Sequence, residues 1–155
     1  MAIVVSRYNA SITDRLLGAA AETYAAAGGS NLAVIDAPGS FELPALALAA
    51  ARTGRFAGIV ALGCLIKGET SHDRYIAEAV SHGLVNVTLV TGVPVTFGLL
   101  TVDTPDQARA RAGGDHGNKG ADAMQALLEV VATIRGLSQG TKSKPTAKPD
   151  KAVRR

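Results

Sequence analysis

Residues 67–72 contain the residue types that acid–base chemistry and anion binding require. They lead into an expected helix, and the free N–H groups and dipole at a helix start favour a bound anion. Gly68 allows the backbone to approach a ligand, and Thr70 offers a hydroxyl. His72 would lie in the first helical turn, where a neutral imidazole can move a proton near pH 7. By spacing alone, a solvated polar histidine is the commoner interpretation.

A second segment, residues 37–42, has a similar layout. It offers backbone N–H groups at a helix start, the aromatic face of Phe41 and the carboxylate of Glu42. A tight turn with Phe41 in the core and Glu42 as a favourable first-turn charge explains the same residues. Farther along, Arg111 and Lys119 flank a glycine-rich segment and could reach a phosphate, although surface cations usually have no specific partner.

The motifs argue against several nucleotide and metal sites. No GxGxxG follows the first apolar run, and the glycine-rich residues 113–120 lack the Lys-Ser/Thr pair of a P-loop. Cys64 is the single cysteine, and no Cys/His cluster has zinc spacing. We interpret Cys64 as a small buried residue, because nothing beside it in the sequence would lower its pKa. The sequence therefore disfavours a dehydrogenase, an ATPase and a zinc site.

Short apolar runs alternate with longer amphipathic segments along the chain. The runs predict strands over residues 3–5, 32–35, 58–62 and 94–100. Helices are expected over residues 11–28, 41–51, 70–88, 105–112 and 118–135. Ser11 and Thr70 are predicted to cap two of these helices, because Asp14 and Asp73 follow them at the spacing of a capping box.

Strands that alternate with helices and are apolar on both faces indicate an α/β fold with a parallel sheet covered on both sides. Ligands bind such sheets beyond the carboxyl ends of the strands. This topology would bring together the loops at residues 6–11, 37–42, 64–72 and 101–105. The two segments with candidate chemistry would then lie side by side.

The 155 residues are enough for one domain, and their 47% apolar content can fill its core. No uncharged apolar run reaches the roughly 18–20 residues that a membrane span needs. The N-terminus lacks the pattern of a secretory signal. With a single cysteine, these features lead us to expect a cytoplasmic protein that has no membrane partner.

Charge is unevenly distributed along the chain. Residues 138–155 carry six basic side chains and one acidic side chain, whereas residues 1–137 carry ten basic and twelve acidic ones. We expect one domain over residues 1–137, followed by a disordered basic tail over residues 138–155 that could touch polyanions by charge alone. The mildly acidic domain offers no basic face for nucleic acid.

Five motifs, taken together, resemble those of the lumazine synthases. They follow the family's order and near-spacing across residues 3–136: RYN at 7–9, PGSFELP at 38–44, GCLIKGETSH at 63–72, PVTFG at 94–98, and RAG at 111–113 with GNKG at 117–120. Five motifs in register are far more specific than any one of them. The resemblance therefore outweighs the simpler interpretation of each segment alone.

The resemblance implies an enzyme of riboflavin biosynthesis. Such enzymes condense 5-amino-6-(D-ribitylamino)uracil with 3,4-dihydroxy-2-butanone 4-phosphate to give 6,7-dimethyl-8-ribityllumazine, and they need no metal or organic cofactor. The family fold is a three-layer flavodoxin-like sandwich with a four-stranded parallel sheet flanked by helices. Its sites lie between neighbouring subunits of a homopentamer, and relatives also form icosahedral capsids of sixty subunits. Riboflavin synthase is a further partner that the resemblance suggests.

The resemblance also implies roles for individual residues. His72 matches the family's proton donor, and Glu69 and Thr70 match its contacts to the butanone phosphate. Arg111 matches the phosphate-binding arginine that an adjacent subunit supplies, with Lys119 as a supporting residue. The positions that match those around the pyrimidine and the ribityl chain are Tyr8, Ser40, Phe41, Glu42, Cys64, Leu65, Ile66 and Phe97.

The chain departs from the family pattern at a few positions. Tyr8 stands where Phe or Trp is more usual, Lys67 replaces a common Arg, and Asp115 adds a negative charge to the glycine-rich turn. About a dozen residues that most members carry before the first strand are missing. In the family, an uninterrupted turn at this place tends to accompany capsids, whereas a longer turn tends to accompany free pentamers. Because residues 113–120 contain no insertion, we rank a capsid slightly ahead of an isolated pentamer or decamer.

Three alternatives remain open. The first is an archaeal-type riboflavin synthase, which has this architecture but dismutates two lumazines. The second is a non-catalytic flavin or lumazine binder, and the third is a purely structural shell protein. The presence of His72, Arg111 and Glu42 argues against a decayed site.

Overall fold

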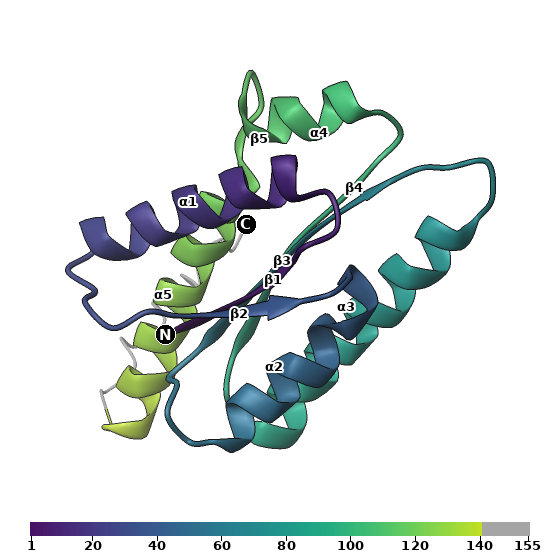
Figure 1. Cartoon of the computed structure of the whole chain (residues 1–155). Helices are drawn as coiled ribbons and strands as arrows, with labels where there is room; N and C mark the ends of the chain where they lie inside the picture. Colours follow the sequence, from purple (N-terminus) through teal and green to yellow (C-terminus); the bar gives the residue numbers. More distant parts are fainter. Residues whose placement is uncertain (141–155) are drawn as a thin grey trace, which may run out of the picture.

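A four-stranded parallel sheet forms the centre of the molecule. In the computed structural model, which describes residues 1–140, the strands lie in the order β2-β1-β3-β4. They are β1 Ala2–Ser6, β2 Ala33–Ala37, β3 Ile59–Ile66 and β4 Val95–Val102. All three pairings are parallel, so the carboxyl ends of the strands meet at one edge of the sheet (Figure 1).

Helices cover both faces of this sheet. Helices α1 (Ala10–Ala26), α4 (Pro105–Arg111) and α5 (Lys119–Ser138) lie on one side, and α2 (Leu43–Arg52) and α3 (His72–Thr91) lie on the other (Figure 1). A 3-10 turn, η1 (Ser40–Glu42), precedes α2. The short strands β5 (Ala112–Gly114) and β6 (Gly117–Asn118) form a hairpin before α5. The three-layer α/β sandwich expected from the sequence is confirmed.

Two apolar clusters hold the layers together, one on each face of the sheet. Alternate residues of β1 serve them: Ile3 packs toward Leu16 and Leu127 under α1 and α5, whereas Val4 packs toward Leu43 under α2. All of these side chains are completely buried. Burying each such side chain contributes about 1.5–3 kcal/mol. The sheet is therefore a rigid platform for the loops at its carboxyl edge.

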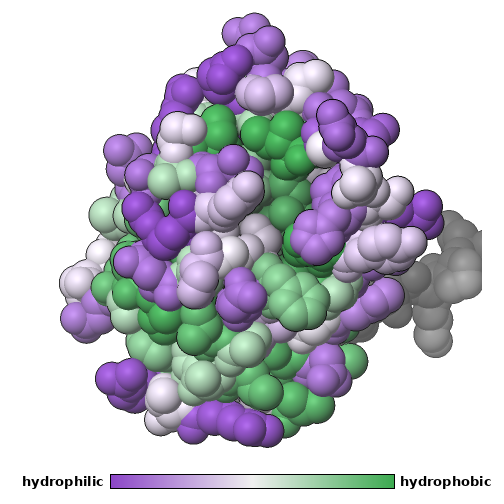
Figure 2. All heavy atoms as spheres, turned by 45° about the vertical axis from the view of Figure 1, so that its right-hand side comes forward, coloured by the Kyte–Doolittle hydropathy of each residue, from purple (hydrophilic) through white to green (hydrophobic). Residues whose placement is uncertain are grey.

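Helix α3 leaves large apolar side chains on its outer side. Tyr75, Val85, Leu89 and Val90 each expose more than half of their surface. The molecular face that α3 belongs to shows apolar areas among polar ones (Figure 2). Exposed apolar surface of this kind is typical of a face that another protein surface covers.

Two predicted helix caps are wrong. Helix α1 begins at Ala10 after Asn9, whose backbone is left-handed with φ 60° and ψ 44°. Ser11 is thus already inside the helix, and Asp14 instead accepts a 2.8 Å hydrogen bond from Arg7. Helix α3 begins at His72, and no side chain caps its N-terminus. The spacing was compatible with capping, but the preceding loops bring the chain into each helix at a different residue.

The third and fourth strands are longer than the sequence predicted. Strand β3 continues to Ile66 because its last residues pair with β4, with Cys64 opposite Leu100 and Ile66 opposite Val102. Cys64 and Leu65 therefore belong to the strand and not to the loop after it. Farther along the chain, α5 ends at Ser138, which is the first residue of the expected tail. The rest of that tail, from residue 141 on, lies outside the described residues.

No helix among residues 1–140 is long and apolar enough to cross a membrane.

Candidate active site

A cavity of about 500 Å³ opens at the carboxyl edge of the sheet. Four segments that are distant in the sequence line it: the β1–α1 loop, the η1 turn, the end of β3, and the loop and first turn of α3. This is the arrangement expected for a ligand site in a parallel α/β sheet. The lining residues are Tyr8, Asn9, Gly39, Ser40, Phe41, Glu42, Cys64, Leu65, Ile66, Gly68, Thr70, His72, Asp73 and Ile76.

The floor of the cavity is apolar and carries one free hydroxyl. Cys64 and Leu65 are buried there at the end of β3. The Ser40 hydroxyl is buried beside the cavity and has no hydrogen-bond partner, so a ligand that reached it would satisfy it. This hydroxyl packs closely on Gly63, because a Cβ added there would lie 2.8 Å from Ser40 Oγ and 2.6 Å from Leu99 Cδ1.

The Cys64 thiol is not suited to nucleophilic chemistry. Burial raises its pKa to about 11, so the thiol stays protonated at neutral pH. It lines the floor as a small apolar group, which agrees with the interpretation from the sequence.

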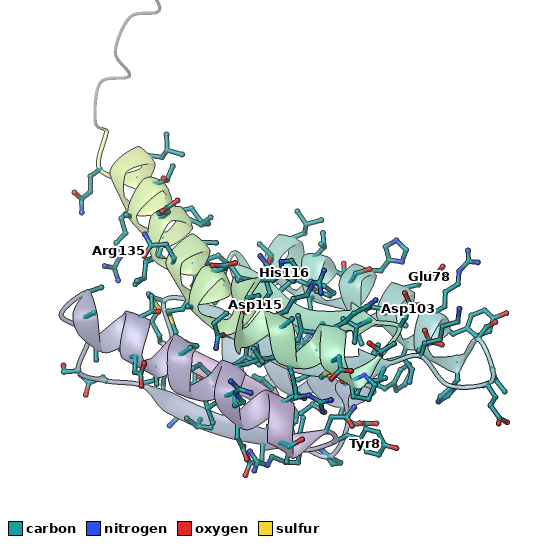
Figure 3. All side chains as sticks on the ribbon, turned by 90° about the horizontal axis from the view of Figure 1, so that it is seen from above. Tyr8, Glu78, Asp103, Asp115, His116 and Arg135 are labelled. Atoms are coloured by element: carbon teal, nitrogen blue, oxygen red, sulfur yellow. The ribbon has the colours of Figure 1, made fainter. Side chains whose placement is uncertain are left out.

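Two aromatic rings flank the mouth of the cavity. Tyr8 exposes 70% of its surface and Phe41 exposes 61%. Tyr8 projects from the loop immediately before α1 (Figure 3). Rings in such positions can stack on a flat heterocycle, and they have little to pack against within one chain. The expectation that Phe41 could be a core residue is wrong.

The start of α3 brings an imidazole and backbone donors to the same mouth. His72 is the first residue of the helix and is exposed to solvent. Because no side chain caps α3, its first-turn N–H groups remain open to an anion beside Thr70. The base of this loop is fixed by the Lys67 N–H, which donates to the Val102 carbonyl at 2.8 Å. Glu69 is exposed in the same loop, but it does not line the cavity.

Three predicted site residues lie elsewhere. Phe97, Arg111 and Lys119 line a second cavity of about 450 Å³ between β4 and α5. Arg111 is half-buried there, and its Nη1 donates to the Gln107 carbonyl at 3.2 Å. The Lys119 ammonium pairs with Asp122 at 2.7 Å. One chain therefore holds the imidazole and the cationic phosphate-binding candidates, Arg111 and Lys119, in separate cavities.

The first cavity also contains residues to which the sequence assigned no role. Asn9, Asp73 and Ile76 are among its lining residues. Asn9 could have been singled out, because asparagine is enriched at left-handed positions and Asn9 lies in the short loop between a strand and a helix. Among residues 1–140, no three His, Cys, Asp or Glu side chains gather closely enough to hold a metal ion.

Comparisons with known proteins agree on one family. Residues 1–135 match the family model described as 6,7-dimethyl-8-ribityllumazine synthase. The chain is 48% identical to 6,7-dimethyl-8-ribityllumazine synthase 1 of Caulobacter vibrioides, over 90% of this chain and 92% of that protein. The protein of that name from Nautilia profundicola is 46% identical, over 84% and 86%. The one from Thermus thermophilus is 43% identical, over 90% of each chain.

Proposed function

Because the chain belongs to the 6,7-dimethyl-8-ribityllumazine synthase family, we propose that it is the enzyme that makes this lumazine in riboflavin biosynthesis. Its substrates are 5-amino-6-(D-ribitylamino)uracil and 3,4-dihydroxy-2-butanone 4-phosphate. The observation that carries the proposal is the cavity at the carboxyl edge of the sheet, which gathers His72, two exposed aromatic rings and an unpartnered buried hydroxyl.

The pyrimidine binds in this first cavity. The flat ring stacks on Tyr8, and the apolar floor of Cys64 and Leu65 supports it from below. The ribityl hydroxyls need polar partners, and the Ser40 hydroxyl and the Glu42 carboxylate lie on the η1 side of the cavity. A buried hydroxyl without a partner costs free energy until a ligand supplies one, so Ser40 favours a polyol in this place.

The butanone phosphate binds at the start of α3. Its phosphate is a dianion, and the open first-turn N–H groups beside Thr70 match it. A second positive group is needed to bind it tightly, and Arg111 is the candidate. In one chain Arg111 lines the other cavity, so a neighbouring subunit supplies it, together with Phe97 and Lys119.

This division of the site requires more than one subunit. The first cavity of one chain faces the second cavity of the next, and such a head-to-tail interface forms a cyclic oligomer when the rotation between subunits closes. We propose the homopentamer of the family, in which the apolar side chains exposed on α3 become buried between copies. Closure of pentamers into a capsid, a cytoplasmic location and association with riboflavin synthase are extensions of the same proposal.

His72 moves the protons of the reaction. The pyrimidine amine attacks the ketone carbon, and the oxygen of the adduct must leave as water when the imine forms. The imidazolium of His72 donates the proton that this oxygen needs, and the neutral imidazole then accepts a carbon-bound proton as phosphate leaves. The second amine closes the ring on the remaining carbonyl, whose oxygen also leaves as water. General acid–base catalysis of this kind contributes about 10²–10⁴ in rate. Holding both substrates together adds a further large factor.

The test is to mix the purified protein with both substrates and to follow the absorbance and fluorescence of the lumazine product. We expect product only when both substrates are present. Supplying 6,7-dimethyl-8-ribityllumazine alone is the matched control, because a riboflavin synthase would convert it to riboflavin. Riboflavin formation in the control, or no lumazine from the two substrates, would contradict the proposal.

A further inference from the structure

The strongest feature outside the assigned roles is the backbone and side chain of Asn9. Asn9 is the one non-glycine residue among residues 1–140 with a positive φ. Asparagine is among the few residues that tolerate this left-handed region. It precedes α1 in the N-cap position, yet its side chain does not cap the helix. Its Nδ2 instead donates a 2.9 Å hydrogen bond to the Cys64 carbonyl, 55 residues away in the sequence.

This hydrogen bond reaches beyond the last pairing of β1 with β3. Strand β1 pairs with β3 only as far as Leu62, and Cys64 lies two residues farther along. The Asn9 amide therefore meets a carbonyl that β1 itself is too short to bond. It ties the β1–α1 loop to the strand that forms the floor of the first cavity.

Tyr8 is held between this link and a second one. On its other side, the Arg7 N–H donates to the Ala37 carbonyl at 2.8 Å, and the Arg7 guanidinium pairs with Asp14 at 2.8 Å. The Tyr8 ring has no such anchor of its own within the described residues and is 70% exposed. Its direction therefore depends on the backbone that Arg7 and Asn9 fix.

We propose that Asn9 is a positioning residue for substrate binding: its left-handed backbone and its bond to the Cys64 carbonyl hold Tyr8 over the first cavity. This inference rests on the proposed function, in which Tyr8 stacks on the pyrimidine. Because the phosphate contacts come from the start of α3 and from a neighbour's Arg111, the loss of the link affects the pyrimidine and not the butanone phosphate.

The experiment combines two variants at position 9 with a variant at Tyr8. Asn9→Asp keeps the size of the side chain but turns an oxygen toward the Cys64 carbonyl, and Asn9→Gly keeps the left-handed backbone without the amide. We expect each to raise the KM for the ribitylaminouracil about fivefold to tenfold, the effect of one hydrogen bond. The KM for the butanone phosphate should stay within about twofold. Asn31→Asp is the matched control and should behave like the wild type, because Asn31 is exposed and lies beside Met1 at the opposite, amino-terminal edge of the sheet.

A double-mutant cycle decides whether Asn9 acts through Tyr8. In the Tyr8→Ala background the ring is absent, so Asn9→Asp and Asn9→Gly should raise the KM for the pyrimidine less than about twofold further. An undiminished rise in that background, or equal rises for both substrates, would overturn the proposal. If Asn9→Asp does not fold, Asn9→Gly carries the same test, because glycine adopts the required φ without strain.

Amide hydrogen exchange separates this inference from the proposed function. The peptide that covers residues 6–14 should exchange faster in both Asn9 variants than in the wild type and in Asn31→Asp, whatever reaction the protein catalyses. Unchanged exchange would overturn the link. Faster exchange together with an inactive wild type would instead overturn the proposed function and, with it, the role in pyrimidine binding.

Discussion

The two cavities of the chain differ in the chemistry that they offer. The first lies at the carboxyl edge of the sheet and contains an imidazole, exposed rings, a free buried hydroxyl and open N–H groups. The second lies beside β4 and contains two cations, Arg111 and Lys119, and the half-exposed ring of Phe97. The first can bind and protonate an organic substrate but lacks a cationic side chain. The second can hold a phosphate but lacks a general acid.

Under the proposed function, neither cavity alone is a complete active site. A reaction that needs a proton donor and a phosphate clamp requires both, and the sheet and α5 hold them apart within one chain. Assembly is therefore a condition for catalysis in this account. Substitutions in the first cavity should change the chemical step or pyrimidine binding, whereas those in the second should change phosphate binding.

The largest effect is expected at His72. His72→Ala removes the proton donor, so kcat should fall by about 10²–10⁴ while the oligomer stays intact. Steady-state turnover from pH 6 to 8, with light scattering for the assembly state, measures both. Near-wild-type turnover across this range would remove the role assigned to His72.

Arg111 should come next, with a different signature. Arg111→Ala removes a charged donor to the phosphate and should raise the KM for the butanone phosphate about 10–100-fold. The KM for the ribitylaminouracil should change little. Arg109→Ala is a suitable control, because Arg109 is an exposed neighbour on α4 that pairs with Asp106. Equal increases for both substrates in Arg111→Ala would indicate a structural role instead.

A substitution at Gly120 tests how closely α5, which carries Lys119 of the second cavity, packs against α1. A Cβ at Gly120 would lie 2.0 Å from the Leu16 carbonyl oxygen, because α5 and α1 approach closely there. Gly120→Ala should therefore lower the free energy of unfolding by about 1–3 kcal/mol. Gly18→Ala is the matched control, since nothing lies within 4 Å of that Cβ, and it should be neutral or stabilising by up to about 1 kcal/mol. Urea unfolding curves compare the two, and equal stabilities would contradict the packing described.

Near neutral pH the smallest effect is expected from Cys64, because its contribution to stability changes only at alkaline pH. Burial raises the pKa of its thiol from 9.0 to about 11, so the folded chain keeps a proton that the unfolded chain loses first. Below pH 9 this group has no effect, and between pH 9 and 11 it lowers the free energy of unfolding as pH rises. Cys64→Ala should show a shallower fall over this window in urea unfolding. Parallel curves for the two proteins would show that the thiol ionises without a burial penalty.

The sequence predicted the sheet well because its two central strands, β1 and β3, are buried on both faces. Ile3-Val4-Val5 and the run of β3 are apolar on both faces, and a parallel sheet covered on both sides buries them. Strand ends were predicted less well, since the extension of β3 to Ile66 depends on pairing with β4, and local propensity does not contain that information. The caps expected at Ser11 and Thr70 were wrong for a similar reason, because the loops before α1 and α3 decide at which residue each helix begins.

The first cavity was largely predictable, because the topology places its loops together whatever their details. Tyr8, Ser40, Thr70 and His72 lie in it as a set. The separation of Phe97 from this set was not predictable from one sequence, because the resemblance placed it around the same ligand without naming the subunit that supplies it. The catalytic and binding roles of all these residues stay predictions until they are measured.

The most direct test of the divided site mixes two impaired variants. His72→Ala and Arg111→Ala subunits are unfolded together in equal amounts, refolded into common oligomers, and assayed with the butanone phosphate well below the KM of Arg111→Ala, where each variant alone turns over little. Where the first cavity of an Arg111→Ala subunit meets the second cavity of a His72→Ala subunit, the site has both residues. Random mixing makes about one quarter of the sites complete, so we predict about a quarter of wild-type turnover. Activity no higher than that of the separately refolded variants would contradict a site shared between subunits.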